Sequence, residues 1–432
     1  MGTNVLDPRL RRFEQADMKG KVVLIRVDHN VVKGGRIKDP YRIDATLGTL
    51  FGVARRGGKP ILMTHVGRPR DKKTGKIQCR DRESVLPIVR YLEGKLSARI
   101  LVPDCAVDPE RGILEPGEAT RNAVEALRAD KVDMVYLPNT RWFQGEQAKG
   151  PEREALAEDL ADLADLFVND AFGSWQAHVS TFDVARRLPA YAGALMQKEL
   201  ANLERVLRPE KPFVGVIAGA KYDTKIGPLR ALHERADALI LGGLMYNTYL
   251  AAKYNLKIGG VTPEDRDLAR ELVALDQGKD KILELPRVVE SETMEGRVDG
   301  RYRTVSLEEL RRRGRADFIV DVDPASFDDQ RVREVVGSAG TFFINAVMGY
   351  MPHFFEGSRA LYRMAASNEQ AAKLYGGGDT LQEFKALCPG DYLRGLDAEG
   401  TYYFTGGGSV LAAIEQGTPY GLEPVRVLME AA

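Results

Sequence analysis

The chain has 432 residues, which is more than one hydrophobic core usually supports, so its length predicts two domains. Lysine and arginine together number 62, and aspartate and glutamate also number 62, so the formal net charge is zero. A neutral chain lacks the excess positive charge of a protein that binds nucleic acid over a broad surface. Basic clusters in it are therefore local features.

Three features of the sequence favour a cytoplasmic protein that does not enter a membrane. The cysteines, Cys79, Cys105 and Cys388, are too few and too scattered for a disulfide framework. Residues 1–20 are polar and charged, unlike a signal peptide. No apolar run reaches the roughly 18 residues that a membrane helix needs. We therefore expect a reducing compartment, and neither a membrane nor a nucleic acid as partner.

The first half of the chain alternates short apolar runs with amphipathic stretches. Apolar runs of this length are typical of strands buried in a parallel sheet, and the stretches between them have helical spacing. The repeated strand–helix–strand pattern predicts an α/β fold with a doubly wound, Rossmann-like parallel sheet. The predicted strands cover residues 22–25, 60–63, 134–137 and 166–168, and the predicted helices cover residues 43–55 and 151–165.

A longer predicted helix at residues 190–206 separates this pattern from a second one. The restart is expected to mark a domain boundary, with a first domain at residues 1–188, a connecting helix at 189–206 and a second domain at 207–411. The strands expected in the second domain cover residues 213–217, 238–241, 281–283, 317–320 and 341–344.

Several basic side chains follow the predicted strands of the first half. Ligands of open α/β sheets bind beyond the carboxyl ends of the strands, so these side chains are expected along one edge of the sheet. Guanidinium groups pair with carboxylates and phosphates, and the pattern therefore favours a site for a small polyanion. The alternative is that each arginine pairs with a nearby acid such as Asp28 or Asp170. The candidate residues are Arg26, Asp28, Asn30, Arg42, His65, Arg68 and Arg141.

The strand ends of the second half carry glycines and two lysines. Lys221 and Lys225 lie on one face of a helix if it begins after Ala220, and could hold nucleotide phosphates as point charges. No G-x-x-x-x-G-K-[ST] loop occurs and no G-x-G-x-x-G motif follows a strand, which argues against P-loop ATPases and dinucleotide dehydrogenases. The other candidates here are Gly219, Gly242, Gly243 and Asn345.

Two glycine-rich turns carry the clearest signal for phosphate binding. The runs Tyr375-Gly-Gly-Gly-Asp379-Thr380 and Thr405-Gly-Gly-Gly-Ser409 each precede a predicted helix, at residues 381–387 and 410–415. Glycines at a strand-to-helix turn let backbone N–H groups approach an anion beside the helix N-terminus. Asp379 adds an oxygen ligand that suits Mg²⁺ carried by a nucleotide phosphate. The alternative is a pair of surface turns in which glycine is needed for a positive φ.

An anion site in one half and a nucleotide-phosphate site in the other predict a kinase whose domains close to exclude water from phosphoryl transfer. The motifs resemble those of the phosphoglycerate kinase family over nearly the whole chain. They are Val23-Leu-Ile-Arg-Val-Asp-His-Asn30 (RVDFN in the family), Thr64-His-Val-Gly-Arg-Pro69 (SHLGRP), Val168-Asn-Asp-Ala-Phe-Gly173 (VNDAFG), Leu195-Met-Gln-Lys-Glu-Leu200, Gly219-Ala-Lys221 with Lys225 (GGAK…K) and the two glycine turns (GGGDT and TGGGA).

The resemblance implies a monomeric, cytoplasmic enzyme of glycolysis with two Rossmann-like domains. The first domain, completed by a tail from about Ala412 onward, would bind 3-phosphoglycerate, and the second would bind Mg-ATP or Mg-ADP. The acceptor's own carboxylate would be the nucleophile, so no protein nucleophile or general base is needed.

The resemblance also assigns roles to individual positions. Substrate-binding positions are those of Asp28, Asn30, Arg42, His65, Arg68 and Arg141, next to Arg26. Nucleotide positions are Gly219, Ala220, Lys221, Lys225, Gly242, Gly243, Asn345, Gly377, Gly378, Asp379 and Thr380, with Asp379 holding Mg²⁺. Phosphoryl transfer itself would use Arg42, Lys221, Lys225, Gly378 and Gly407.

The sequence departs from the family pattern at three places. Gln176 stands where the family has an arginine that contacts the substrate phosphate, in a segment that is one residue shorter, and Arg186 and Arg187 nearby could compensate. Pro352 replaces the glutamate that binds the ribose hydroxyls. His29 replaces the phenylalanine of RVDFN, either as a satisfied core histidine or as an added polar contact at the substrate edge.

These departures keep two other functions open. One is a paralogue that phosphorylates a different small carboxylate, which the altered Gln176 segment favours. The other is a non-catalytic binding protein on a kinase scaffold, which would predict the loss of the lysines or of Asp379, and both are present.

Overall fold

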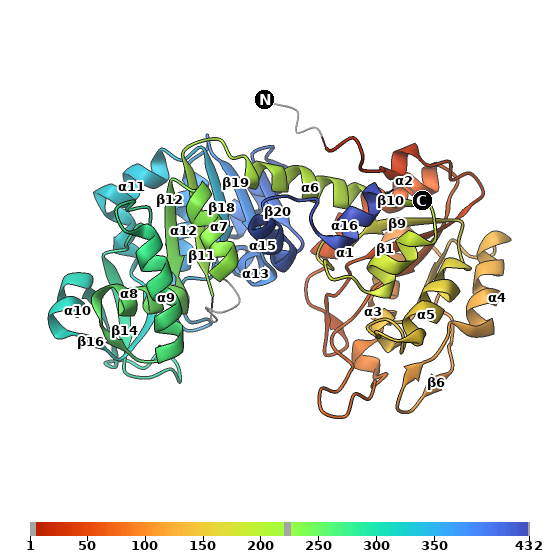
Figure 1. The fold of residues 1–432 in the computed structure, drawn as a ribbon, viewed down its shortest axis with the longest axis horizontal. Coiled ribbons are helices and arrows are strands. Elements are labelled where there is room, and N and C mark those ends of the chain that lie inside the picture. Colours follow the sequence, from red (N-terminus) through yellow and green to blue (C-terminus); the bar gives the residue numbers. More distant parts are fainter. Residues whose placement is uncertain (1–5, 220–225, 431–432) are drawn as a thin grey trace. The chain divides into compact units, whose positions relative to one another are not determined.

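A computed structural model describes residues 6–219 and 226–430. The chain divides into two compact units, one formed by the residues up to Ala201 together with those from Tyr420 on, and the other by Asn202–Pro419 (Figure 1). The division falls within helix α6 (Ala194–Leu207) rather than at one of its ends. No helix in the described part of the chain is both long and apolar enough to cross a membrane.

The first unit is built on a six-stranded sheet in which every pairing is parallel. Its strand order is β10-β9-β1-β4-β8-β5, and all six residues of the central strand β1 are buried. The strands are β1 (Val22–Val27), β4 (Lys59–Met63), β5 (Ile100–Leu101), β8 (Met134–Tyr136), β9 (Leu166–Asp170) and β10 (Ala190–Ala192).

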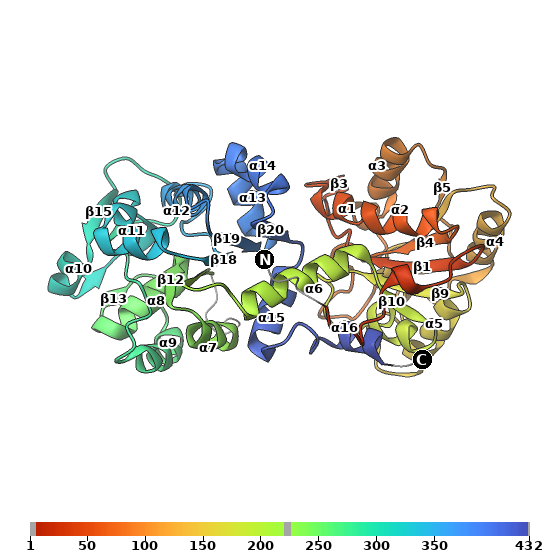
Figure 2. The same ribbon diagram turned by 90° about the horizontal axis from the view of Figure 1, so that it is seen from above.

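Helices cover both faces of this sheet (Figure 2). Because side chains alternate along a strand, Val23, Ile25 and Val27 of β1 enter the core under α2 and α3, while Arg26 points to the opposite face. The helix predicted at 43–55 is broken at Thr46 into α1 and α2. The helices are α1 (Tyr41–Ala45), α2 (Leu47–Arg55), α3 (Leu86–Leu96), α4 (Gly117–Arg128) and α5 (Pro151–Ala161), with short turns η3 (Thr140–Trp142) and η4 (Val179–Asp183).

The C-terminal segment completes the first unit. Helix α16 (Glu423–Arg426) and the turn η7 (Val427–Met429) lie against it, and Leu428 O accepts a hydrogen bond from Arg11 N at 3.3 Å. Asn169 Nδ2 in turn donates to Pro424 O at 3.5 Å. The segment that joins the first unit begins at Tyr420, later than the expected Ala412, because residues up to Gln416 form a helix of the second unit.

The second unit contains a five-stranded parallel sheet in the order β12-β11-β18-β19-β20. Helices α12 and α13 lie on one face and α7 and α15 on the other (Figures 1 and 2). The strands are β11 (Phe213–Ala218), β12 (Ala238–Gly242), β18 (Thr341–Asn345), β19 (Ala372–Gly376) and β20 (Thr401–Phe404). The helices are α7 (Ile226–Arg235), α8 (Gly243–Tyr254), α12 (Glu356–Ser367), α13 (Gly378–Leu387), α14 (Pro389–Asp397) and α15 (Gly407–Gln416).

Two smaller sheets extend the second unit. Strands β15 (Tyr302–Ser306), β14 (Arg287–Ser291) and β17 (Phe318–Val322) form an antiparallel sheet in that order. A short parallel pair joins β13 (Lys257–Ile258) to β16 (Arg315–Ala316). Helices α9 (Pro263–Asp276), α10 (Leu307–Arg313) and α11 (Gln330–Gly337) accompany them.

The two-sheet α/β architecture expected from the sequence is confirmed, and so is a strand at 317–320, but two other predicted elements are wrong. Residues 190–192 form edge strand β10 rather than the start of a helix, because α6 begins only where Asp170 Oδ1 accepts from Leu195 N and Met196 N. Residues 281–283 make one isolated bridge, Leu239 to Ile282, instead of a strand. The strand predicted at 317–320 lies in the antiparallel sheet as β17, because β14 rather than a core strand pairs with it.

Candidate functional site

The predicted anion-binding residues of the first unit lie at the carboxyl end of its sheet. Arg26 lies near the end of β1 and Asp28 directly follows it, His65 and Arg68 follow β4, and Arg141 lies in η3 after β8. The pairing register of the strands places these ends side by side. Arg26 of β1 pairs with Met63 of β4, and Leu62 of β4 pairs with Tyr136 of β8. Neighbouring parallel strands therefore deliver the side chains to one edge.

The basic groups at this edge act on one another electrostatically. The pKa of His65 is held well below its usual range, first by burial and then by the positive charges of Arg26, Arg141, His178 and Arg42. Burial likewise lowers the pKa of Arg141, which also feels the charges of Arg26 and Arg68. Such a concentration of positive charge favours an anionic ligand.

One acid sits inside the basic cluster. Asp28 is 3% exposed, and its Oδ2 forms an ion pair with Arg42 Nη1 at 3.2 Å. Its other oxygen, Oδ1, is buried without a hydrogen-bond partner among the described residues. Because buried acceptors are nearly always satisfied, this oxygen is suited to accept a bond from a ligand's hydroxyl group.

Pairing with acids does not account for the other arginines. Arg26, Arg68 and Arg141 form no ion pair with any residue in the described ranges, and Asp170 caps helix α6 instead of meeting an arginine. The alternative in which each arginine is neutralised by a nearby carboxylate therefore holds for Arg42 only.

The loop after β4 is anchored on both sides. Asn30 Oδ1 accepts from Gly67 N at 2.9 Å, and Arg141 Nη1 donates to Gly67 O at 2.5 Å. Asn139 also holds this loop, accepting from Val66 N at 2.9 Å and donating to Val66 O at 2.7 Å. Arg68, the next residue along, is thus carried on a fixed loop although its own side chain is exposed.

Sequence reasoning missed the residues that hold Arg26. Ser180 Oγ accepts from Arg26 Nε at 2.8 Å and donates to Glu146 Oε1 at 2.6 Å, and both Ser180 and Glu146 are buried. Ser180 lies in η4 and Glu146 in the loop before α5, and neither belongs to a motif. Only the folded chain brings them to the arginine.

The glycine-rich turns of the second unit touch each other at the carboxyl end of its sheet. Gly377 has φ +104°, a conformation that favours glycine. A Cβ atom on Gly377 would lie 2.8 Å from Asn345 Nδ2, and Asn345 Nδ2 donates to Gly376 O at 2.6 Å. Helices α13 and α15 begin within these glycine-rich runs, at Gly378 and Gly407, so both helix N-termini lie at the turns.

The other predicted nucleotide residues lie along the same edge. Gly242 ends β12 and Gly219 follows β11, and β11 lies between β12 and β18 in the sheet. A Cβ atom on Gly243 would lie 3.6 Å from Gly219 O. Ala220, Lys221 and Lys225 lie outside the described residues.

Asp379 and Thr380 lie in the first turn of α13. Asp379 is exposed, while Thr380 is 4% exposed. No group of three or more histidine, cysteine, aspartate or glutamate side chains able to hold a metal ion occurs among the described residues. A single carboxylate at a helix N-terminus fits a Mg²⁺ ion whose remaining ligands are phosphate oxygens and water.

The sequence model of the family described as phosphoglycerate kinase matches residues 13–417. The chain is 34% identical over 410 residues to the phosphoglycerate kinase of Rubrobacter xylanophilus, covering 94% of this chain and 95% of that one. It is 35% identical over 422 residues to that of Thermus thermophilus, covering 96% and 99%. The solved structure of phosphoglycerate kinase from Coxiella burnetii superposes with a TM-score of 0.74 at 27% identity, covering 97% and 98%.

The chain belongs to the phosphoglycerate kinase family. It is a phosphotransferase with a carboxyl group as acceptor, as the sequence motifs predict. This identification covers nearly the whole chain.

Gln176 stands exposed where the phosphoglycerate kinase motif has an arginine. The two arginines considered as substitutes are engaged elsewhere. Arg187 forms an ion pair with Glu154, and the guanidinium of Arg186 lies 5.7 Å from the ring centroid of Phe182. These contacts give no support to compensation by Arg186 or Arg187.

The other two departures from the phosphoglycerate kinase motifs have different consequences. His29 is fully buried, with Nδ1 2.9 Å from Tyr136 Oη and Nε2 3.0 Å from Thr46 Oγ1, which supports the core-histidine alternative. Pro352 is exposed, and the next acid along the chain, Glu356, pairs with Arg297 at 2.5 Å. Glu356 is therefore not a ready substitute for the missing glutamate.

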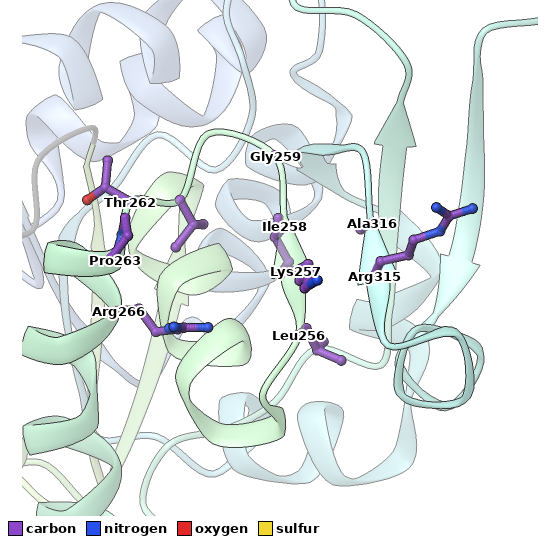
Figure 3. A pocket seen from close by; sticks show the side chains of 10 residues that line it. Leu256, Lys257, Ile258, Gly259, Thr262, Pro263, Arg266, Arg315 and Ala316 are labelled. Carbon is purple, nitrogen blue, oxygen red and sulfur yellow. The ribbon is translucent and has the colours of Figure 1, made fainter.

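A separate cavity of about 390 Å³ lies between β13, β16 and the start of α9 (Figure 3). Lys257 and Arg315 stand on the paired strands and Arg266 on α9, and none of them forms an ion pair with another described residue. None of the residues predicted to bind substrate or nucleotide lines this cavity.

Proposed function

We propose that the chain performs the phosphoglycerate kinase reaction with the two groups of residues at the carboxyl edges of its sheets. In the forward direction a carboxylate oxygen of 3-phosphoglycerate attacks the γ-phosphorus of ATP. The new bond joins that oxygen to phosphorus, and the bond to the β–γ bridging oxygen breaks, so that ADP leaves with the electron pair. The acyl phosphate and ADP are the products.

The basic cluster of the first unit would hold the acceptor. Arg68, Arg141 and His65 supply donors for an anionic group, and the buried Oδ1 of Asp28 can accept from a hydroxyl group. Arg42, tethered to Asp28, would neutralise charge that develops on the transferring phosphoryl group. The observation that carries the proposal is this cluster, whose arginines other than Arg42 have no carboxylate partner in the described ranges.

The glycine edge of the second unit would hold the nucleotide. Backbone N–H groups at Gly378 and Gly407 start two helices and are suited to phosphate oxygens. Asn345 fixes the first turn through Gly376 O, and Asp379 would hold a nucleotide-borne Mg²⁺, which supplies charge neutralisation at the phosphates. Lys221 and Lys225 would add positive charge. Because the two groups belong to different units, turnover requires that the units bring the substrates together.

The proposal extends to partners and location. The chain would act as a monomer in the cytoplasm, with Mg-ATP or Mg-ADP and 3-phosphoglycerate as its substrates. The exposed Gln176 favours a second candidate, a paralogue that phosphorylates a different small carboxylate and does not need that arginine. The intact glycine turns and Asp379 leave a purely non-catalytic binding role as the weakest of the three.

The test is ADP release from Mg-ATP by the purified protein with 3-phosphoglycerate, in parallel with small carboxylic acids that lack the phosphate. Turnover with 3-phosphoglycerate supports the main proposal. Turnover only with another acid supports the paralogue. Nucleotide binding without turnover on any acid would leave the binding role.

A further inference from the structure

Arg26 is a buried cation whose side chain contacts no carboxylate among the described residues. It is 1% exposed. Its Nη2 lies 3.0 Å from His65 Nδ1 and 3.4 Å from Ser174 Oγ, its Nε donates to Ser180 Oγ at 2.8 Å, and its Nη1 donates to Val27 O. Every polar end of the guanidinium is thus committed to a neutral group.

The contact between Arg26 and His65 has only one chemically consistent direction. A guanidinium group has donors and no acceptor, so Nδ1 of His65 must accept. A histidine whose Nδ1 accepts is neutral and carries its proton on Nε2. Nε2 makes no hydrogen bond to another described residue. The ring therefore presents one N–H group, on the side away from Arg26.

The surroundings of His65 reinforce this state. The charged groups that act on it are Arg26 from β1, Arg42 from α1, Arg141 from η3 and His178 from the segment before η4. All of them disfavour a second proton on the ring, and so does its burial at 8% exposure. The ring is thus a neutral donor within a cluster of cations.

We propose that Arg26 is a positioning residue that fixes His65 as a neutral Nε2–H donor for the anionic acceptor. The acceptor's identity rests on the function proposed above, whereas the state of His65 does not. A donor fixed in this way holds the anion without changing its charge around neutral pH. Acceptor binding then shows no histidine titration of its own.

The first test is nitrogen NMR of the full-length protein labelled with ¹⁵N-histidine and free of substrates. The chain has five histidines, and a His65→Gln variant assigns the signal. We expect a non-protonated Nδ1, a protonated Nε2 and no titration between about pH 6 and 8, where ordinary histidines change charge. A proton on Nδ1, or a midpoint within that range, overturns the proposal whether or not the enzyme is active.

The second test removes the guanidinium. In an Arg26→Met variant we expect a tautomer with the proton on Nδ1 to appear in the NMR experiment, because Nδ1 has lost the donor that it accepted from. Burial and the remaining cations should keep the ring neutral, and the KM for 3-phosphoglycerate should rise roughly 10-fold. Arg187→Met, which removes a surface arginine of the same unit, is the matched control and should leave the His65 signal unchanged.

The outcomes separate the proposal from the proposed function. If His65 still carries its proton on Nε2 alone in Arg26→Met, Arg26 does not fix the tautomer and the inference fails. If His65 behaves as expected but 3-phosphoglycerate is not turned over, the positioning role stands and the acceptor is wrong. A variant that does not fold leaves the wild-type NMR result to decide.

Discussion

Gly407 lies so close to Gly377 that a Cβ atom added to Gly407 would stand 2.6 Å from the Cα atom of Gly377. The same atom would lie 3.4 Å from Asn345 Nδ2. The two glycine-rich turns are therefore one structure, held by the amide that also bonds Gly376 O. A side chain at either glycine would separate backbone N–H groups that are proposed to bind the same phosphates.

We predict that Gly407→Ala lowers kcat about 100-fold, the scale of losing one preorganised backbone donor. Overpacking at this contact should also lower the free energy of unfolding by about 1–3 kcal/mol. Steady-state kinetics and urea unfolding measure the two effects. Gly390→Ala in α14 is the control, because a Cβ there meets only Arg394 Nη1, at 4.0 Å. Equal activities of the two variants would contradict the role of the joined turns.

The sequence predicted the parallel sheets because their strands are continuous apolar runs bounded by glycine and polar residues. It misplaced residues 190–192, since Ala190, Tyr191 and Ala192 fit a helix pattern as well as a strand. The choice is made by Asp170, which lies far away in the chain and caps α6 at Leu195 and Met196. A local pattern cannot contain that information.

The predicted site residues meet at two sheet edges because strand ends of parallel sheets converge, which is a rule of topology rather than of composition. Their individual contacts did not follow from the sequence. Arg26 stands in the same motif as Asp28, yet its side chain is buried on Ser180, Ser174 and His65 from other segments. The antiparallel sheet around β14 was missed because its strands carry charged residues such as Arg287 and Glu290.

Replacement of Arg42 is predicted to affect phosphoryl transfer far more than nucleotide binding. Arg42→Ala should lower kcat about 1,000-fold, because arginines that neutralise a transferring phosphoryl group contribute on that scale. The affinity for Mg-ADP, measured by calorimetry, should stay within about twofold, since Arg42 belongs to the other unit. Arg187→Ala controls for loss of a positive charge in the first unit. A similar loss of nucleotide affinity and kcat would show that Arg42 does not act at the transferring group.

The buried bonds of His29 predict a coupling between it and Tyr136. Burial lowers the pKa of His29 to about 3, so the ring is neutral, and both of its nitrogens are bonded inside the core. His29→Phe should cost about 1–3 kcal/mol of unfolding free energy, because Tyr136 Oη is left buried without its partner. His29→Phe combined with Tyr136→Phe should recover most of that loss in urea unfolding. A double variant that is as unstable as the sum of the two single variants would refute the coupling.

Glu383 predicts a pH-dependent stability of the second unit. Burial raises the pKa of Glu383 to about 7, against about 4.3 in an unfolded chain. Between these values the folded state holds more protons, so the stability that this group contributes is present below about pH 4 and is lost as the pH rises toward 7. Glu383→Gln can keep the bond from Tyr362 Oη and should raise the free energy of unfolding by about 1–3 kcal/mol more at pH 8 than at pH 4.5. The exposed Glu264→Gln should show no such difference, and an equal effect of Glu383→Gln at both values of pH would count against a neutral carboxyl in the fold.

The Gln176→Arg substitution restores the arginine of the family motif and tests whether the acceptor site lacks a contact to the substrate phosphate. Gln176 is exposed, and Arg186 and Arg187 are engaged elsewhere, so neither of these two arginines is positioned to supply a guanidinium in its place. If 3-phosphoglycerate is the acceptor, Gln176→Arg should lower its KM about 10-fold, because a charge-assisted bond to phosphate contributes about 1.5 kcal/mol or more. The kcat should change little, since the phosphate is remote from the reacting carboxylate. Gln15→Arg adds the same charge to another exposed position of the first unit and should leave the KM unchanged. A KM that is unchanged in Gln176→Arg, or that falls for an acid without a phosphate, would instead favour the paralogue with a different acceptor.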